Sequence, residues 1–147
     1  MKPVYISLNT LNSIKNTLCN YSAECGGVIA SDSNGHIVDF YFDHEAGVGK
    51  KSYHPSSSTI NQIVNEKWLP GGLQFSGVVH SHPSGTRHYP SKVDLITAEK
   101  ILSKNTGSDS ILLMITQNSK IKVWEMKSNQ SLRECKLYVN SVNQFKS

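Results

Sequence analysis

The chain has 147 residues, of which 37% are hydrophobic and 18% charged, and its formal net charge at pH 7 is +4. This composition excludes a disordered chain, and no apolar run approaches the roughly 18–20 residues that a membrane span needs. The lysines are scattered rather than gathered in one block, which argues against a nucleic-acid partner. We expect one domain over residues 1–147. We also expect a cytoplasmic location, because the first residues lack the apolar stretch of a signal peptide.

The first part of the chain predicts one helix and two strands. Residues 7–20 form an amphipathic helix in this prediction, since their apolar residues recur at helical spacing and either Ser7 or Asn9 can cap it. Residues 24–30 are too few and too rich in glycine for a helix and predict a buried strand. A hairpin turn signal at residues 32–35 leads into a returning strand over residues 37–42.

The middle of the chain predicts two more helices with a strand between them. Residues 43–56 are a polar loop, and the amphipathic helix after them ends before the Pro-Gly-Gly sequence at residues 70–72. Residues 73–80 predict a strand that runs into a loop rich in proline and glycine. Ser91 then opens the third helix.

The last part of the chain predicts a hairpin of residues 111–116 and 121–126, followed by a strand or a short helix over residues 132–139. Helices and strands are mixed along the chain without a regular βαβ alternation. We therefore expect an α+β fold, with a sheet and helices packed on its faces.

The three cysteines, Cys19, Cys25 and Cys135, are odd in number and widely spaced. This argues against a disulfide framework and fits a reducing compartment. Cys25 is expected to be a small buried residue rather than a nucleophile, because no basic neighbour would lower its pKa.

Two histidines stand at a strand end, in the sequence Val-Val-His-Ser-His-Pro at residues 78–83. Side chains alternate faces along a strand, so His80 and His82 point to the same side. The proline ends the strand just beyond them, where a site open to substrate would lie. Ser91 and Asp94 form a capping-box pattern, and a carboxylate in the first turn of that helix can reach the strand end.

These side chains predict a metal centre. Two imidazoles and one carboxylate suit Zn²⁺, and three protein ligands leave a fourth position for water. Bound zinc lowers the pKa of that water to about 7. The reaction also needs a general acid/base, and Glu24, which is followed by the small residues Cys-Gly-Gly, is the candidate.

These elements together resemble the JAMM, or MPN-type, metalloproteases. Residues 24–29 are similar to the glutamate strand of that family, residues 80–83 match its His-x-His-Pro motif, and residues 91–94 match its Ser-x-x-Asp motif. By order of elements the resemblance covers residues 7–126. It implies a JAMM/MPN-like, cytidine-deaminase-like mixed sheet flanked by helices.

Carried over by position, the resemblance makes His80, His82 and Asp94 the zinc ligands and Glu24 the acid/base. Ser91 becomes the hydroxyl that stabilises the oxyanion. The resemblance further implies an (iso)peptidase that cleaves after the C-terminal tail of a ubiquitin-like protein. Small bacterial members of the family that this chain resembles act on ubiquitin-like or sulphur-carrier proteins, and some are encoded beside E1-like and E2-like enzymes in anti-phage operons.

One departure from the family pattern lies in the loop between the two motifs. Eight residues, 83–90, separate His82 from Ser91, one more than is usual in the family. Loops absorb single insertions at little cost, so the site is expected to close normally. The chain also lacks the long insertion with which larger members hold ubiquitin, which favours a bacterial relative of ubiquitin as substrate.

Two other functions stay open beside the protease. The first is a non-catalytic MPN-like scaffold or binding module, although all five site positions are filled here. The second is a peptidase of phage-tail or cell-wall type on the same fold, which an export signal or a fused domain would support. The oligomeric state cannot be predicted from the sequence.

Each site residue also has a purely structural interpretation. Ser91 can serve only as an N-cap, and Asp94 only as a first-turn carboxylate favoured by the helix dipole. Trp68 and Trp124 are expected in or beside the core. The remaining histidines are expected to face solvent: His36, His44, His54 and His88.

Overall fold

The computed structural model describes residues 1–18, 24–43, 55, 57–83, 85–104 and 109–140. The strands in these residues are β1 (Lys2–Ser7), β2 (Gly26–Ser31), β3 (Ile37–Phe42), β4 (Gln74–Ser81), β5 (Ser110–Gln117), β6 (Lys120–Lys127) and β7 (Leu132–Asn140). The helices are α1 (Leu8–Leu18), α2 (Ser57–Ile63) with its π-helical continuation η1 (Val64–Trp68), and α3 (Lys92–Lys104). The predicted α+β class is therefore confirmed. None of the described helices has the length and apolar character to cross a membrane.

The strands form one mixed sheet in the order β1-β3-β2-β4-β5-β6-β7, and this order closes on itself. β1 lies parallel to β7 over Lys2–Ser7 and touches β3 at a single pair of residues, Ile6 and Ile37. The β1–β3 and β4–β5 pairs are also parallel. The other four pairs, β2–β3, β2–β4, β5–β6 and β6–β7, are antiparallel. The closing strand β1 was not predicted, because six residues that include a proline give too short a pattern.

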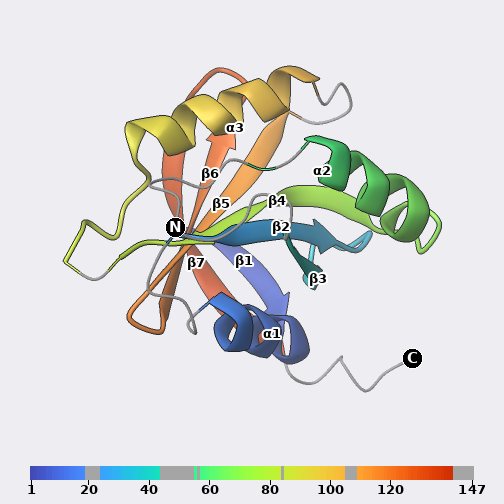
Figure 1. Ribbon diagram of the computed structural model, residues 1–147, viewed down its shortest axis with the longest axis horizontal. Coiled ribbons are helices and arrows are strands. Elements are labelled where there is room, and N and C mark those ends of the chain that lie inside the picture. Colours follow the sequence, from blue (N-terminus) through green and yellow to red (C-terminus); the bar gives the residue numbers. More distant parts are fainter. Residues whose placement is uncertain (19–23, 44–54, 56, 84, 105–108, 141–147) are drawn as a thin grey trace.

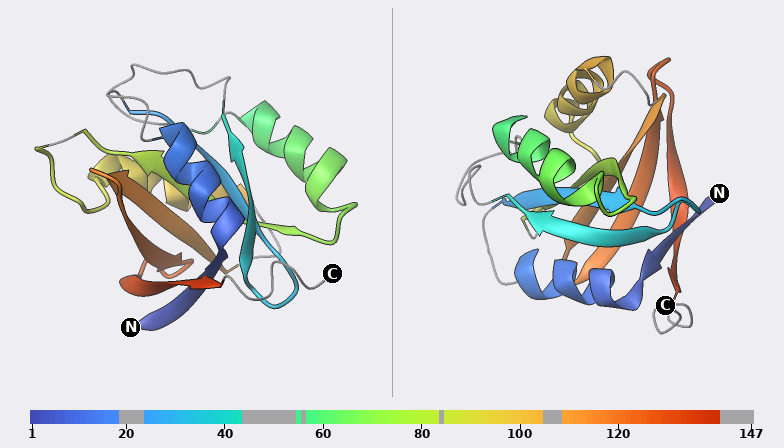
Figure 2. Two further views of the ribbon diagram at one scale, coloured as in Figure 1. Left: turned by 90° about the horizontal axis from the view of Figure 1, so that it is seen from below. Right: turned by 90° about the vertical axis from the view of Figure 1, so that its right-hand side faces the viewer.

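The helices cover the sheet from two sides. α2 and α3 lie on one side of the strands and α1 lies on the other (Figure 1), and both views of Figure 2 agree with this arrangement. α1 begins where the sequence predicts, since the Oγ atom of Ser7 accepts a hydrogen bond from the backbone N–H of Thr10 at 3.2 Å. The predicted hairpins at residues 32–35 and 117–120 and the capped start of α3 are likewise confirmed.

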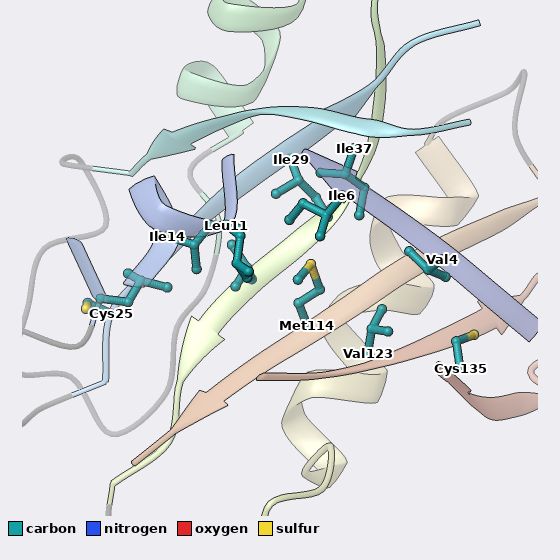
Figure 3. Packing of buried hydrophobic residues seen from close by; sticks show 12 residues of the cluster. Val4, Ile6, Leu11, Ile14, Cys25, Ile29, Ile37, Met114, Val123 and Cys135 are labelled. Atoms are coloured by element: carbon teal, nitrogen blue, oxygen red, sulfur yellow. The ribbon is translucent and has the colours of Figure 1, made fainter. Parts of the chain in front are cut away.

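Two hydrophobic clusters fill the two sides of the sheet. The cluster under α1 joins Leu11 and Ile14 of the helix to Ile29, Met114 and other strand residues (Figure 3). The cluster under α2, η1 and α3 contains both tryptophans, which are 0% and 2% exposed. The expected core positions of Trp68 and Trp124 are thus confirmed.

Successive residues of β4 contribute to opposite clusters. Val78 packs under α3, whereas Val79 packs under α1. This alternation continues into the histidine motif and places His80 and His82 on the side of α3. Gly77 lets β4 and β5 approach, because a Cβ atom there would lie only 2.1 Å from the carbonyl oxygen of Leu112.

Candidate metal centre

His80 and His82 lie at the end of β4, in the position that strand alternation predicts. His80 pairs with Gly26 of β2 and with Ile115 of β5, and its side chain is 3% exposed. His82 extends the pairing by one residue, because its backbone N–H donates to the carbonyl oxygen of Thr116 at 2.9 Å. The centroids of the two imidazole rings are 4.7 Å apart. The predicted common orientation of the two histidines is confirmed.

Asp94 reaches the histidines from the first turn of α3. A reciprocal capping box fixes it: the Asp94 N–H donates to Ser91 Oγ at 3.1 Å, and the Ser91 N–H donates to Asp94 Oδ2 at 2.7 Å. The two carboxylate oxygens then lie 3.2 Å from His80 Nε2 and 3.3 Å from His82 Nε2. The cap thus determines which way the carboxylate points.

Glu24 stands just before β2 and enters the same cluster. Its Oε1 atom lies 3.4 Å from His80 Nδ1, and its side chain is 10% exposed. One donor atom from each of four residues, Glu24, His80, His82 and Asp94, lies within 4.8 Å of the other three. The structure therefore brings together the three predicted ligands and the predicted acid/base. Ser91 stands beside them as the N-cap of α3.

A contact that sequence reasoning missed joins the glutamate segment to the histidine strand. The backbone N–H of Cys25 donates to Ser81 Oγ at 3.2 Å, and the backbone N–H of Ser81 donates to the carbonyl oxygen of Cys25 at 2.9 Å. Strand alternation could have indicated this contact, because the side chain of Ser81 must point to the face of β4 opposite the two histidines. Cys25 is 0% exposed and not part of a disulfide, as expected.

The electrostatics of the cluster favour a positive charge at its centre. Burial lowers the pKa of His80, but the carboxylates of Asp94 and Glu24 outweigh it and raise that pKa to about 9. Burial likewise opposes ionisation of Asp94, yet the hydrogen bonds from His80 and His82 bring its pKa well below the usual range. His80 lies between two carboxylates, with Asp94 at Nε2 and Glu24 at Nδ1, and both favour its positively charged form.

The donor set fits a divalent metal ion. Two imidazole nitrogens and carboxylate oxygens are ligands for Zn²⁺ and for related first-row metals. His80 Nε2, His82 Nε2 and the Asp94 carboxylate face one another and would hold such an ion.

The loop after His82 departs from one sequence prediction. His88, expected to face solvent, is half-buried: its Nε2 atom donates to the carbonyl oxygen of Ile115 at 2.7 Å, and its ring meets Trp124 edge-on. Burial lowers the pKa of His88, with a weaker contribution from nearby Lys122. The prediction failed because Ile115 and Trp124 come close only through the pairing of β5 with β6 and the return of the loop.

Two of the three other histidines expected to face solvent, and one cysteine, cannot be compared with the structure. His44, His54 and Cys19 lie outside the described residues. His36 is half-buried rather than fully solvent-facing, with its ring 5.2 Å from that of Tyr5.

Comparison with known proteins agrees with this geometry. The family model of prokaryotic homologs of the JAB domain matches residues 11–132. The chain therefore belongs to the prokaryotic homologs of the JAB domain. Among proteins with curated descriptions, none matches.

Two solved structures show the same fold. The protein DSY2949 from Desulfitobacterium hafniense is 16% identical, with a TM-score of 0.62 over 94% of this chain and 93% of that one. AF2198, a JAB1/MPN domain protein from Archaeoglobus fulgidus, is 15% identical, with a TM-score of 0.52 over 94% of this chain and 100% of that one. At these identities the likeness concerns the fold alone. The family and the four-residue cluster together support a JAMM-like metallohydrolase.

Proposed function

We propose that this chain is a zinc-dependent (iso)peptidase that hydrolyses the bond after the C-terminal tail of a ubiquitin-like protein. The observation that carries the proposal is the convergence of Glu24, His80, His82 and Asp94 at one strand end in a JAB-family chain. The partner would be a ubiquitin-like protein or its conjugates, with E1-like and E2-like enzymes in the same cytoplasmic pathway.

In this proposal His80, His82 and Asp94 hold the metal. Zinc bound there would supply a Lewis acid for the scissile carbonyl and a water whose pKa falls to about 7. Asp94 keeps its carboxylate ionised and aimed at both imidazoles through the capping box, so the ligand set is organised before the metal arrives.

Glu24 is the proposed general acid/base. It takes a proton from the attacking water and returns it to the leaving amine, the role for which a carboxylate at the edge of the cluster is suited. Its neighbour Cys25 is hydrogen-bonded to Ser81, so the glutamate is held against the histidine strand. The side chain is nevertheless not sealed, since 10% of it is exposed.

Ser91 is the proposed oxyanion donor. Its Oγ atom accepts the hydrogen bond from the Asp94 N–H, and this bond does not use the hydroxyl hydrogen. Ser91 is exposed, so its hydroxyl can both cap the helix and donate to a tetrahedral oxyanion.

Turnover of a ubiquitin-like fusion tests the reaction and the base together. The zinc-loaded protein should cleave the fusion, and a chelator should stop cleavage. Glu24→Gln should lower the rate by about 10²- to 10⁴-fold while zinc stays bound by elemental analysis. Normal turnover by Glu24→Gln would refute the assignment of the base. Zinc binding without any cleavage would favour the scaffold or binding module instead.

A further inference from the structure

The loop from His82 to Ser91 is fastened to the end of β5 by a side chain that no motif contains. The Nε2 atom of Gln117 lies 2.9 Å from the carbonyl oxygen of Pro83 and 2.7 Å from that of Thr86. It also lies 3.1 Å from Thr86 Oγ1. An amide nitrogen carries two hydrogens, so this one group can hold the carbonyl groups of Pro83 and Thr86 at once.

The turn is also closed from within. Thr86 Oγ1 donates to the carbonyl oxygen of Pro83 at 2.7 Å, and Gly85 adopts a φ of +88°, which a residue without a Cβ atom tolerates. This is the loop that has one residue more than the family usually has. Gln117 therefore holds this loop at two described residues, Pro83 and Thr86, neither of which belongs to the zinc-ligand set.

The residue after this turn contacts a metal ligand. The carbonyl oxygen of Arg87 lies 3.1 Å from His82 Nδ1. A carbonyl oxygen can only accept, so the proton of this bond belongs to Nδ1. The other ring nitrogen, Nε2, then faces Asp94 and is the atom available to a metal.

The two residues on either side of Arg87 are both hydrogen-bonded to β5. On one side Thr86 is held by Gln117, and on the other side His88 is held by the carbonyl oxygen of Ile115. Ile115 and Gln117 are two residues apart on β5. Thr116 between them accepts the backbone N–H of His82. The end of β5 thus holds the backbone of His82 directly and the side chain of His82 through the loop.

We propose that Gln117 is a positioning residue of the metal centre, acting through the Arg87 carbonyl on the orientation of the His82 ring. The proposal rests on the zinc site described under the proposed function. Outer groups that orient a histidine ligand are worth about 10- to 100-fold in metal affinity. We expect a loss of this size when the amide donor of Gln117 is removed.

Two variants of the full chain test this with Zn²⁺ itself. Gln117→Ala removes the amide, and Gln117→Glu keeps its size but has no N–H to donate. Both should bind Zn²⁺ about 10- to 100-fold more weakly than the unchanged protein in competition with a chromophoric chelator. The added negative charge of Gln117→Glu would by itself favour a cation, so a loss in that variant must come from geometry. The visible absorption spectrum of the Co²⁺-loaded form should also change, because it reports ligand geometry.

Gln130→Ala is the matched control. The Gln130 side chain also donates one hydrogen bond, to Glu99 at 2.9 Å, but it does so in an exposed turn away from the cluster. This variant should keep the zinc affinity and the Co²⁺ spectrum. Thermal unfolding of the metal-free proteins shows that each variant is folded before the metal is added.

Three outcomes overturn the inference. It is wrong if both Gln117 variants bind Zn²⁺ within about twofold of the unchanged protein, and also if Gln130→Ala weakens binding equally. When the first outcome occurs in a protein that itself binds Zn²⁺ and cleaves its substrate, only the role of Gln117 is refuted and the proposed function stands. If the unchanged protein binds no Zn²⁺, the proposed function falls with it.

Discussion

Gly77→Ala tests the link between the packing of the sheet and the candidate metal centre. An added Cβ atom would lie 2.1 Å from the carbonyl oxygen of Leu112 and 2.8 Å from its carbonyl carbon. These are backbone atoms of the neighbouring strand, so no side-chain rotation relieves the contact. β4 and β5 must separate locally, and forced shifts of this kind cost typically 1–3 kcal/mol.

The same separation should reach His80 and His82, the proposed metal ligands. Gly77 is three residues before His80 on β4, and β5 carries Thr116, which holds the His82 backbone. We therefore expect Gly77→Ala to lower the free energy of unfolding in urea by about 1–3 kcal/mol and to weaken Zn²⁺ binding as well.

Gly71→Ala is the control for this substitution. A Cβ atom at Gly71 would lie 3.1 Å from the carbonyl oxygen of Lys67, in an exposed turn where the chain can adjust. Its effect on stability should stay below about 0.5 kcal/mol. The reasoning is refuted if Gly77→Ala unfolds at the same urea concentration as the unchanged protein, or if it is destabilised and yet binds zinc with full affinity.

Three further predictions concern the site, the sheet and the π-helical segment. Asp94→Asn removes the charge that lies next to both imidazoles, so the purified variant should contain little zinc by elemental analysis; full occupancy would contradict the ligand set. Burial opposes ionisation of Glu125, but Lys2 and Arg133 outweigh it and lower its pKa. Glu125 therefore contributes stability above the unfolded value of about 4.3, and this contribution is lost as the pH falls through the lower folded value. The stability gap between the unchanged protein and Glu125→Gln should then be wide at pH 7 and shrink below about pH 4.3, whereas a gap independent of pH would argue against the ion pairs. Trp68→Phe removes the N–H that donates to Asp39 Oδ2 at 2.8 Å and should cost about 2 kcal/mol in urea unfolding; an unchanged midpoint would show that this bond contributes nothing.

Features that depend on neighbouring residues could be predicted from the sequence alone. The common face of His80 and His82 follows from the two-residue period of a strand, and the cap of α3 follows from the spacing of Ser91 and Asp94. Both predictions rest on local geometry, which a short segment determines by itself. The sequence thus singled out the four residues of the cluster, although their convergence required the fold.

Features that depend on distant pairing were decided by the tertiary structure. The segment that became β7 was compatible with a strand or a short helix, and it is a strand because it pairs with β6 on one side and with β1 on the other. β1 is a strand because it pairs with β7 along its whole length, with Lys2 opposite Cys135. A six-residue segment has too little pattern of its own to specify a strand, so partners more than a hundred residues away supply the hydrogen bonds.

The candidate metal centre likewise combines features set by the local sequence with features set by the fold. The sequence by itself determined the donor atoms and the strand end that presents His80 and His82. Only the fold brought Glu24 and Asp94 to them, buried His88 against Trp124, and placed Gln117 under the loop that orients His82. The physical reason is that ligand chemistry belongs to single side chains, whereas ligand orientation depends on which strands lie side by side.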